Sequence, residues 1–324
     1  MNMKKYKTKF LTIILGVLCA WIITGCSNDD AELGKFVALD PGAIAIYSTD
    51  GINWNGPGEL PQPVSSWDNI CYGDGKFVAV GEGTSGMAAY SEDGITWSAE
   101  KISNDPGTQW SGVCYGNGKF VAVELNYYET AYSADGKNWY PGKTLTSGAG
   151  SVCYGIGRFV AVGGGGFTAY SDDGITWYPG AGLTSGGFIR VCYGKGRFVA
   201  VGSSNMVAYS TNGKDWSLGT MSGNVRNWFS VCYGNGMFIA IDNSYLDGNV
   251  AYSADGINWT RLNRAVNARY VCYGNDKFVA VGSEPYPSDK VSISTDGINW
   301  KEIEIPFWCT LITYGLDNTV FGFL

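Results

Sequence analysis

The chain has 324 residues and a mass of 34.8 kDa, which suits one large domain or two of ordinary size. It carries 22 Lys and Arg residues against 29 Asp and Glu residues, and a formal net charge of −7 argues against a nucleic-acid or anionic-membrane partner. The absence of histidine excludes Ser-His-Asp and Cys-His catalysis and every zinc site that uses histidine. With 47 glycines and 15% aromatic residues, the composition favours turn-rich β structure.

The first predicted element is a targeting segment, residues 1–25. Its basic start contains four lysines, and their removal would leave a net charge of −11. The apolar run that follows, residues 10–24, is shorter than the roughly 20 residues of a membrane-spanning helix. The run ends in Ile23-Thr24-Gly25-Cys26, which resembles the lipobox of bacterial lipoproteins; the alternative is a plain signal peptide with a chance cysteine.

The lipobox resemblance implies cleavage before Cys26, lipidation of its thiol and retention at a membrane. Ser27, where an aspartate would favour the inner membrane, favours the bacterial outer membrane. The segment Ser27-Asn28-Asp29-Asp30 also resembles the surface-export tag of Bacteroidetes lipoproteins. We therefore expect residues 26–33 to be a lipidated cysteine with a short tether, through which alone the protein contacts the membrane.

Residues 34–324 form the predicted domain, in which one unit repeats seven times. The unit reads V-C-Y-G-x-G-K/R-F-V-A-V-G, a variable stretch, A-Y-S-x-D-G-x-x-W and a second variable stretch. The tryptophans that close successive units are 43, 42, 38, 39, 43 and 41 residues apart. A period near 41 is typical of a four-stranded propeller blade.

Each unit predicts four strands. In the unit that contains Cys114, residues 113–115 predict an inner strand, and Asn117-Gly118 predicts a tight turn into a second strand, residues 119–123. A third strand follows at residues 131–133, and a fourth is expected to contain Trp139. Four strands in each of seven units predict an all-β fold, a seven-bladed β-propeller.

The two ends of the domain are expected to share one blade. The first unit lacks its inner strand and begins at residues 34–39, while residues 311–315 supply a strand of the missing kind. Residues 319–323 resemble a second strand and compete with residues 36–39 for the same place. The sequence leaves open which of these two segments closes the ring.

The S-x-D-G-x-x-W segment resembles the Asp-box (BNR) repeat of sialidase-type propellers, with one residue fewer between Asp and Gly. This resemblance implies the propeller architecture but no activity, since Asp boxes occur in enzymes, lectins and assembly factors. The aspartate is expected to accept turn amide hydrogens, the glycine to take the left-handed conformation and the tryptophan to pack beneath the turn. We expect no metal at these carboxylates and no cofactor elsewhere.

Six cysteines occupy one position of the predicted inner strands: Cys71, Cys114, Cys153, Cys192, Cys232 and Cys272. Equivalent positions in neighbouring blades should lie roughly 10 Å apart, whereas a disulfide needs Cα atoms within about 7 Å. We therefore interpret them as free thiols that pack as small hydrophobic side chains between blades. A metal-binding ring of thiolates is the less favoured alternative.

The variable stretches predict where a ligand binds, because alternating strand direction places them all on one face of the ring. They include residues 81–87, 124–130, 242–249 and 283–290. At the expected mouth of the central channel we predict a ligand-binding rim that consists of Trp67, Asp68, Trp110, Phe188, Arg190, Trp228, Arg269 and Trp308. Such rings can stack on sugars or anchor a partner chain, and Tyr127, Tyr128 and Tyr245 strengthen that interpretation. The alternative is that the rings only fill wedges between blades.

An enzyme is the third hypothesis. Arg190, Arg226 and Arg269 could converge as the arginines of sialidases do, but the F/Y-R-I-P motif and a Tyr–Glu pair are missing, so no catalytic role is carried over. A carboxylate pair for another glycosidase or lyase could come from five residues: Asp68, Glu82, Glu124, Asp242 and Glu284.

The sequence thus predicts a monomeric, lipid-anchored and noncatalytic propeller that binds a glycan or an envelope protein through its variable face. The rival hypotheses are a scaffold or assembly factor in an envelope complex and a sialidase-like carbohydrate-active enzyme.

Overall fold

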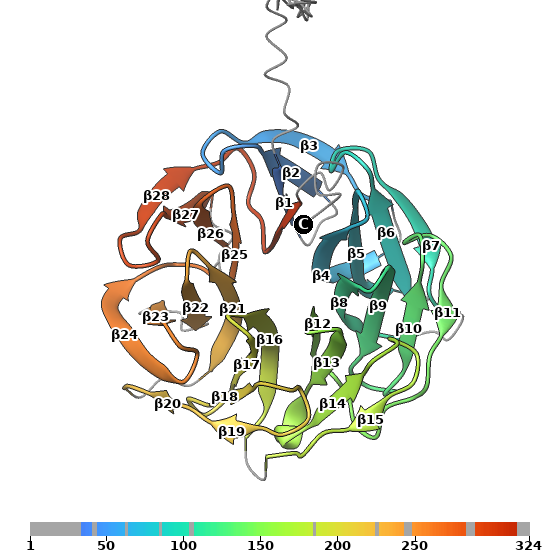
Figure 1. The fold of residues 1–324 in the computed structure, drawn as a ribbon. Helices are drawn as coiled ribbons and strands as arrows, with labels where there is room; N and C mark the ends of the chain where they lie inside the picture. The colour runs from blue at the N-terminus through green and yellow to red at the C-terminus, as the bar shows by residue number, and fades with distance from the viewer. Residues whose placement is uncertain are drawn as a thin grey trace, which may run out of the picture. The chain divides into compact units, whose positions relative to one another are not determined.

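The computed structural model describes residues 34–40, 44–61, 64–83, 86–103, 107–183, 186–223, 227–242, 248–282 and 289–315. Within these ranges, strands form seven small sheets arranged in a ring (Figure 1), which confirms the predicted seven-bladed β-propeller. Six sheets have four strands, and the seventh gains a fifth because β20 (Thr220–Met221) pairs in parallel with β24 (Asn258–Ala265). No helix in the described part of the chain is long and apolar enough to cross a membrane.

Each blade runs from an inner strand near the ring centre to an outer strand at the circumference. The inner strands are β29 (Leu311–Gly315), β4 (Val64–Gly73), β8 (Trp110–Gly116), β12 (Ser151–Gly155), β16 (Phe188–Gly194), β21 (Trp228–Gly234) and β25 (Tyr270–Gly274). The second strands are β1 (Lys35–Leu39), β5 (Lys76–Gly83), β9 (Lys119–Glu124), β13 (Arg158–Val162), β17 (Arg197–Gly202), β22 (Met237–Asp242) and β26 (Lys277–Val281).

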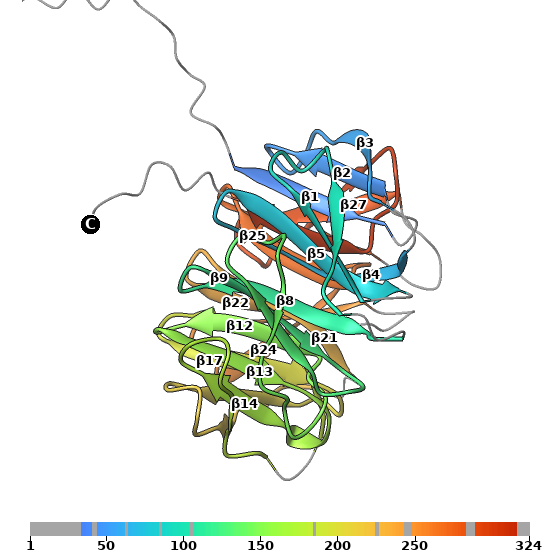
Figure 2. The ribbon, with the colours of Figure 1, turned by 90° about the vertical axis from the view of Figure 1, so that its right-hand side faces the viewer.

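The third strands are β2 (Ile44–Ser48), β6 (Met87–Ser91), β10 (Thr130–Ser133), β14 (Thr168–Ser171), β18 (Val207–Ser210), β23 (Asn249–Ser253) and β27 (Lys290–Ser294). The outer strands are β3 (Asn55–Glu59), β7 (Ser98–Lys101), β11 (Tyr140–Pro141), β15 (Tyr178–Pro179), β19 (Ser217–Leu218), β24 and β28 (Lys301–Glu304). A short 3-10 turn, η1 (Gly164–Gly166), precedes β14. Seen from the side in Figure 2, the strands cross the thickness of the ring, so one face carries the inner-to-second turns and the other carries the variable loops.

The core lies between neighbouring blades and consists mainly of the second strands. Phe120, Val121, Ala122 and Val123 of β9 are all 0% exposed. A second strand is covered on both faces because it lies inside a sheet that is itself packed between two others. This double burial explains why the repeated F-V-A-V segment is a continuous apolar run instead of an alternating one.

A tyrosine–glycine contact joins each blade to the next. A Cβ atom on Gly116 would lie 2.1 Å from the Tyr154 ring of the following inner strand, so only glycine allows the two inner strands to approach so closely. The same contact forms between Gly315 of β29 and Tyr72 of β4. The inner-strand packing is therefore continuous across the meeting point of the two ends of the domain.

The ring closes through β29 and β1, which pair antiparallel with Phe36 opposite Tyr314. The strand order β29-β1-β2-β3 confirms the predicted blade shared by the two ends and assigns the second position to residues 35–39. The competing segment, residues 319–323, lies outside the described residues, as does Cys26 with the targeting segment.

The repeated aspartate turn has the geometry expected from the sequence. Asp50 Oδ1 accepts hydrogen bonds from the amides of Ile52 and Asn53 at 2.8 and 2.7 Å, and the Ser48 hydroxyl accepts one from the Gly51 amide. Gly51 has a φ of 72°, the left-handed conformation. Burial raises the pKa of Asp50, but the hydrogen bonds from Asn53 and Ile52 outweigh it and lower that pKa to about 2.

We predicted that the outer strand contains the tryptophan that ends this turn, but the strand begins one residue after it. Trp139 closes the turn, where its Nε1 donates to the Gly136 carbonyl at 3.3 Å, and the outer strand begins at Tyr140. Because the indole ring packs beneath the turn, the backbone of the tryptophan remains in the turn and does not pair with the third strand. Only in β24 does the described outer strand include its tryptophan, Trp259.

Candidate functional site

Four predicted rim residues are buried where the inner strands begin on the loop face. Trp67, Trp110, Phe188 and Trp228 are 4%, 1%, 3% and 0% exposed, and each packs in a hydrophobic core cluster with residues of the second strands. Trp228 also donates from its Nε1 to Asn205 Oδ1 at 2.9 Å. Buried rings offer no face to a ligand, so the structure favours the wedge interpretation for these four residues.

Three other predicted aromatic residues are exposed. Trp308 is 39% exposed, and Tyr127 and Tyr128 are 59% and 43% exposed in the loop between β9 and β10. Tyr245 and Arg226 lie outside the described residues. Within the described ranges, these loop residues contribute exposed aromatic area to the loop face.

A β-bulge accompanies each of the four buried rings. In β16 the pairing shifts between Phe188 and Arg190, and in β21 it shifts between Trp228 and Ser230. The same shift follows Trp67 in β4 and Trp110 in β8. Each bulge leaves one residue without a partner in the ladder and re-aims the side chains around it. The four bulge residues are Asp68, Ser111, Ile189 and Phe229.

The predicted Arg190 reaches past the neighbouring blade. Its guanidinium donates to the Gly150 and Ile189 carbonyls at 3.1 and 3.0 Å and to the Tyr270 hydroxyl at 3.0 Å. Tyr270 belongs to β25, and the sheet that contains β21 lies between that blade and the blade of Arg190. The bond therefore joins two blades that are not neighbours.

The predicted Arg269 meets Arg190 on a shared aromatic surface. The guanidinium carbons of Arg269 and Arg190 lie 4.0 and 5.8 Å from the centre of the Phe229 ring, and 5.9 and 5.3 Å from that of Tyr270. The two rings pack edge to face at 5.8 Å. Cation–π contacts of this kind hold both guanidinium groups in place while their charges remain half-buried.

Asp68 lies within electrostatic range of both arginines. Burial raises its pKa to about 6, against the lowering effects of a hydrogen bond with Gln109 and of the charges of Arg190 and Arg269. The exposed Glu82 adds to the rise. We call Asp68, Arg190, Phe229, Arg269 and Tyr270 the axis cluster. Its residues come from four blades, and its two fixed guanidinium groups suit an anionic ligand group such as a carboxylate.

Asp68, Arg190 and Arg269 of the axis cluster were among the predicted rim residues, whereas Phe229 and Tyr270, and Gln109 beside the cluster, were not. Phe229 directly follows Trp228, and in a regular strand neighbouring side chains point to opposite faces. The predicted rim took the equivalent position from each blade, so it included Trp228 and omitted Phe229. The bulge places Phe229 beside the arginines. The only sequence signal for the bulge is the large aromatic residue, Trp228, that precedes it.

Two carboxylates proposed for an enzyme hold the backbone of loops instead. Glu124 is 0% exposed and accepts hydrogen bonds from the amides of Gln109, Asn126, Tyr127 and Tyr128. Asp242 is 1% exposed and accepts from the amide of Asn249 at 2.8 Å. Glu284 lies outside the described residues. These bonds give Glu124 and Asp242 a structural role. Of the same set, Asp68 belongs to the axis cluster, and the charge of Glu82 acts on it.

The six repeated cysteines are free and half-buried, and each packs against the core between its blade and a neighbour. Burial raises the pKa of each thiol, and in Cys153 the nearby Cys114 and Cys192 raise it further. The thiols are thus protonated near neutral pH, as expected of small hydrophobic side chains. In the described ranges, no group of three or more Cys, Asp or Glu residues could hold a metal ion.

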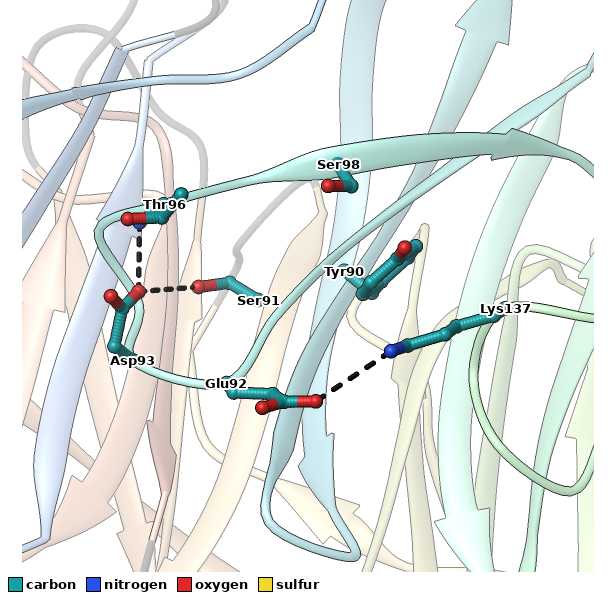
Figure 3. Close-up of a pocket in the computed structure, with 7 residues that line it drawn as sticks. All are labelled: Tyr90, Ser91, Glu92, Asp93, Thr96, Ser98 and Lys137. Atoms are coloured by element: carbon teal, nitrogen blue, oxygen red, sulfur yellow. Dashed lines mark hydrogen bonds and ion pairs between the residues drawn. The ribbon is translucent and has the colours of Figure 1, made fainter.

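A hollow of about 580 Å³ lies beside the aspartate turn that contains Asp93. Figure 3 draws the residues that line it. Its charged groups already have partners: Glu92 pairs with Lys137 at 3.6 Å, and the Lys137 ammonium lies 4.7 Å from the centre of the Tyr90 ring. Asp93 accepts hydrogen bonds from the Thr96 amide and the Ser91 hydroxyl. The hollow therefore results from the turn and its contact with the next blade. The axis cluster is the stronger candidate for a ligand-binding site.

No protein-family model and no curated protein matches the chain. Among solved structures, it resembles YCF48 bound to D1 peptide, with a TM-score of 0.57 and 14% identity over 84% of each chain. It also resembles streptogramin B lyase, with a TM-score of 0.64 and 12% identity over 76% of this chain and 85% of that one. The WD40 propeller domain of Doa1 gives a TM-score of 0.63 and 10% identity over 82% and 92%. Similarity at these identities shows that the chain has a β-propeller fold.

Proposed function

We propose that this protein is a noncatalytic binding module of the bacterial cell envelope that holds an acidic segment of a protein partner at its axis cluster. The observation that carries the proposal is the pair of guanidinium groups on Phe229, which come from separate blades and end at one half-buried place on the loop face. The exposed Tyr127, Tyr128 and Trp308 provide further contact area on that face. That one structural neighbour was solved with a peptide supports a protein partner.

A protein partner is favoured over a glycan at the predicted rim because the four rings that were to stack on sugars are buried. An enzyme is less favoured because Glu124 and Asp242 are bonded to loop amides. The lipobox resemblance supports attachment through lipidated Cys26 at the outer membrane, exposed on the surface if the segment after Cys26 acts as an export tag. Labelling cells with a palmitate analogue tests the anchor, since a Cys26→Ala chain should lose the label.

The proposed partner is tested by crosslinking in native envelopes followed by affinity capture. The wild-type chain should retain a specific protein, and the double variant Arg190→Ala/Arg269→Ala should lose it. Arg158→Ala is the matched control, because Arg158 pairs with Asp172 at 2.6 Å on the opposite face and should not affect capture. Capture should also weaken as salt rises, since charge pairing is screened. Equal capture by the double variant, or capture of a polysaccharide alone, would contradict the proposal.

A further inference from the structure

The loop between β9 and β10 carries three exposed apolar residues within four positions. Leu125, Tyr127 and Tyr128 are 39%, 59% and 43% exposed. The other exposed large hydrophobic residues of the described ranges stand singly along the chain. A group of such side chains at a protein surface marks an interaction site, because its exposure to water is unfavourable. We call residues 125–128 the loop tip.

The equivalent loop of the next blade has no such tip. The Glu124 amide donates to the Glu129 carbonyl at 3.1 Å, and in the next blade the Gly163 amide donates to the Phe167 carbonyl at 3.0 Å, so the two loops correspond. The second loop encloses only the three glycines of η1, Gly164–Gly166. The loop tip is therefore particular to its own blade and is not required by the repeat.

A buried carboxylate holds the loop tip in one conformation. Glu124 is 0% exposed. Its carboxylate accepts hydrogen bonds from the Asn126 and Tyr128 amides at 2.7 and 2.9 Å, and from the Tyr127 amide. Tyr128 has a φ of 64°, a left-handed conformation that large side chains rarely adopt and that is concentrated at functional sites. Because the loop is already ordered, binding does not have to supply that entropic cost.

Gln109 joins the loop tip to the axis cluster. Its Oε1 accepts a hydrogen bond from Asn126 Nδ2 at 3.3 Å, and its side chain also forms a hydrogen bond with the Asp68 carboxylate. One side chain therefore connects the two surfaces. An extended peptide advances about 3.3–3.6 Å per residue, so a single short segment can reach both of them.

The two surfaces select different side chains. The guanidinium groups of Arg190 and Arg269 suit a carboxylate, as argued above. The loop tip holds one leucine, two tyrosines and an asparagine, and it has no charged residue. Burial of apolar surface against it contributes about 25 cal/mol per Å², and tyrosine is among the residues that most often anchor interfaces. The tip therefore suits a large apolar side chain.

We propose that the loop tip is a second anchor for the partner segment held at the axis cluster. The protein then recognises an acidic residue that has a large apolar residue, such as Leu or Phe, within a few positions of it. This inference rests on the proposed function, because the axis cluster holds the acidic residue, and it adds the apolar residue as a requirement.

The test measures the binding of synthetic peptides to the full chain purified from membranes, by fluorescence anisotropy. The first series places one aspartate and a Leu-Phe pair at varied spacing, and in both orders, in a Gly-Ser background. The second series replaces the Leu-Phe pair by serines, and the third replaces the aspartate by asparagine. Wild type should bind at least one peptide of the first series at least about tenfold more tightly than both counterparts, or by about 1.4 kcal/mol.

The double variant Leu125→Ser/Tyr127→Ser should lose the preference for the Leu-Phe pair and should bind the second series like wild type. Tyr140→Ser is the matched control, because Tyr140 is 54% exposed on the outer strand β11, and it should keep the preference. Arg190→Ala/Arg269→Ala should lose binding of both series that contain aspartate. Thermal unfolding shows that each variant is folded.

Equal affinity of wild type for the first and second series would overturn the inference and leave the proposed function intact. An undiminished preference in the loop variant would also overturn it, because the apolar residue would then bind elsewhere. Unchanged binding by the arginine variant would contradict the proposed function and with it the inference. If no peptide of the first series binds, the inference is wrong, while capture from native envelopes still decides the proposed function.

Discussion

The two faces of the ring use similar residue types for different purposes. On the turn face, each described repeat places its serine and its aspartate or asparagine in the same short-range hydrogen bonds, so the polar groups are satisfied within three residues. On the loop face, bulges place single residues such as Asp68 and Phe229 beside charges from other blades. The repeated residues of the turn face therefore stabilise the fold, whereas the residues of the loop face can differ from blade to blade.

The largest expected effect is on the free energy of unfolding, and it distinguishes buried from exposed aromatic rings on the loop face. Trp228→Ala should lower the free energy of unfolding by about 3–5 kcal/mol, because it leaves a cavity in the core between two blades. Trp308→Ala should change it by less than about 0.5 kcal/mol, because that ring is 39% exposed. Urea unfolding followed by circular dichroism measures both. A stable Trp228→Ala chain would show that the ring is not a wedge and would restore it to the predicted rim.

A smaller effect is expected at the turn face. Asp135 Oδ1 accepts hydrogen bonds from the Ser133 hydroxyl and the amides of Lys137 and Asn138, so Asp135→Ala should cost about 1–3 kcal/mol. Asp135→Asn should cost less, because Asn212 already makes the equivalent bonds at the fifth turn. If Asp135→Asn is as unstable as Asp135→Ala at neutral pH, the turn depends on the charge and not on the bonds.

The turn aspartates also predict acid sensitivity. Their pKa values are lowered in the folded state, so the stabilisation is present above the unfolded value of about 3.9 and is lost as pH falls toward the folded values, about 2 for Asp50. The melting temperature of wild type should therefore fall as pH decreases below about 4, and Asp135→Asn should fall less steeply. Parallel curves for the two chains would contradict this origin.

The smallest expected effect lies at the axis cluster. The pKa of Asp68 is raised to about 6 by burial, so its contribution to stability is present below about pH 4 and is lost as pH rises to about 6. Asp68→Asn should therefore raise the melting temperature more at about pH 7.5 than at about pH 5. Arg190, Arg269, Gln109 and Glu82 face Asp68 in both chains, so the difference isolates its charge. An equal change at both pH values would mean that Asp68 is not desolvated.

The sequence was sufficient for features that the repeat dictates. The seven copies of the aspartate turn predicted the number of blades, and the inner strand missing before residue 35 predicted closure by residues 311–315. Both follow from short-range patterns that are present in the chain itself. The free cysteines were also predictable, because the geometry of neighbouring blades separates them.

The axis cluster was only partly predictable. Arg190 and Arg269 stand out as charges at the start of inner strands, but the contact of Arg190 with Tyr270 depends on a side chain that reaches past the intervening blade. The contribution of Phe229 depends on a bulge, which a two-residue period cannot reveal.

The most direct test of the proposed function places one photo-crosslinking residue on each face. Trp308 on the loop face and Ile156 on the turn face are 39% and 52% exposed, so benzoylphenylalanine at either position should leave the fold intact. Irradiated cells should yield the same protein adduct from the Trp308 position that affinity capture identifies, and none from the Ile156 position. An adduct from the Ile156 position alone would show that the partner binds the repeated turns, and it would contradict a binding site at the axis cluster.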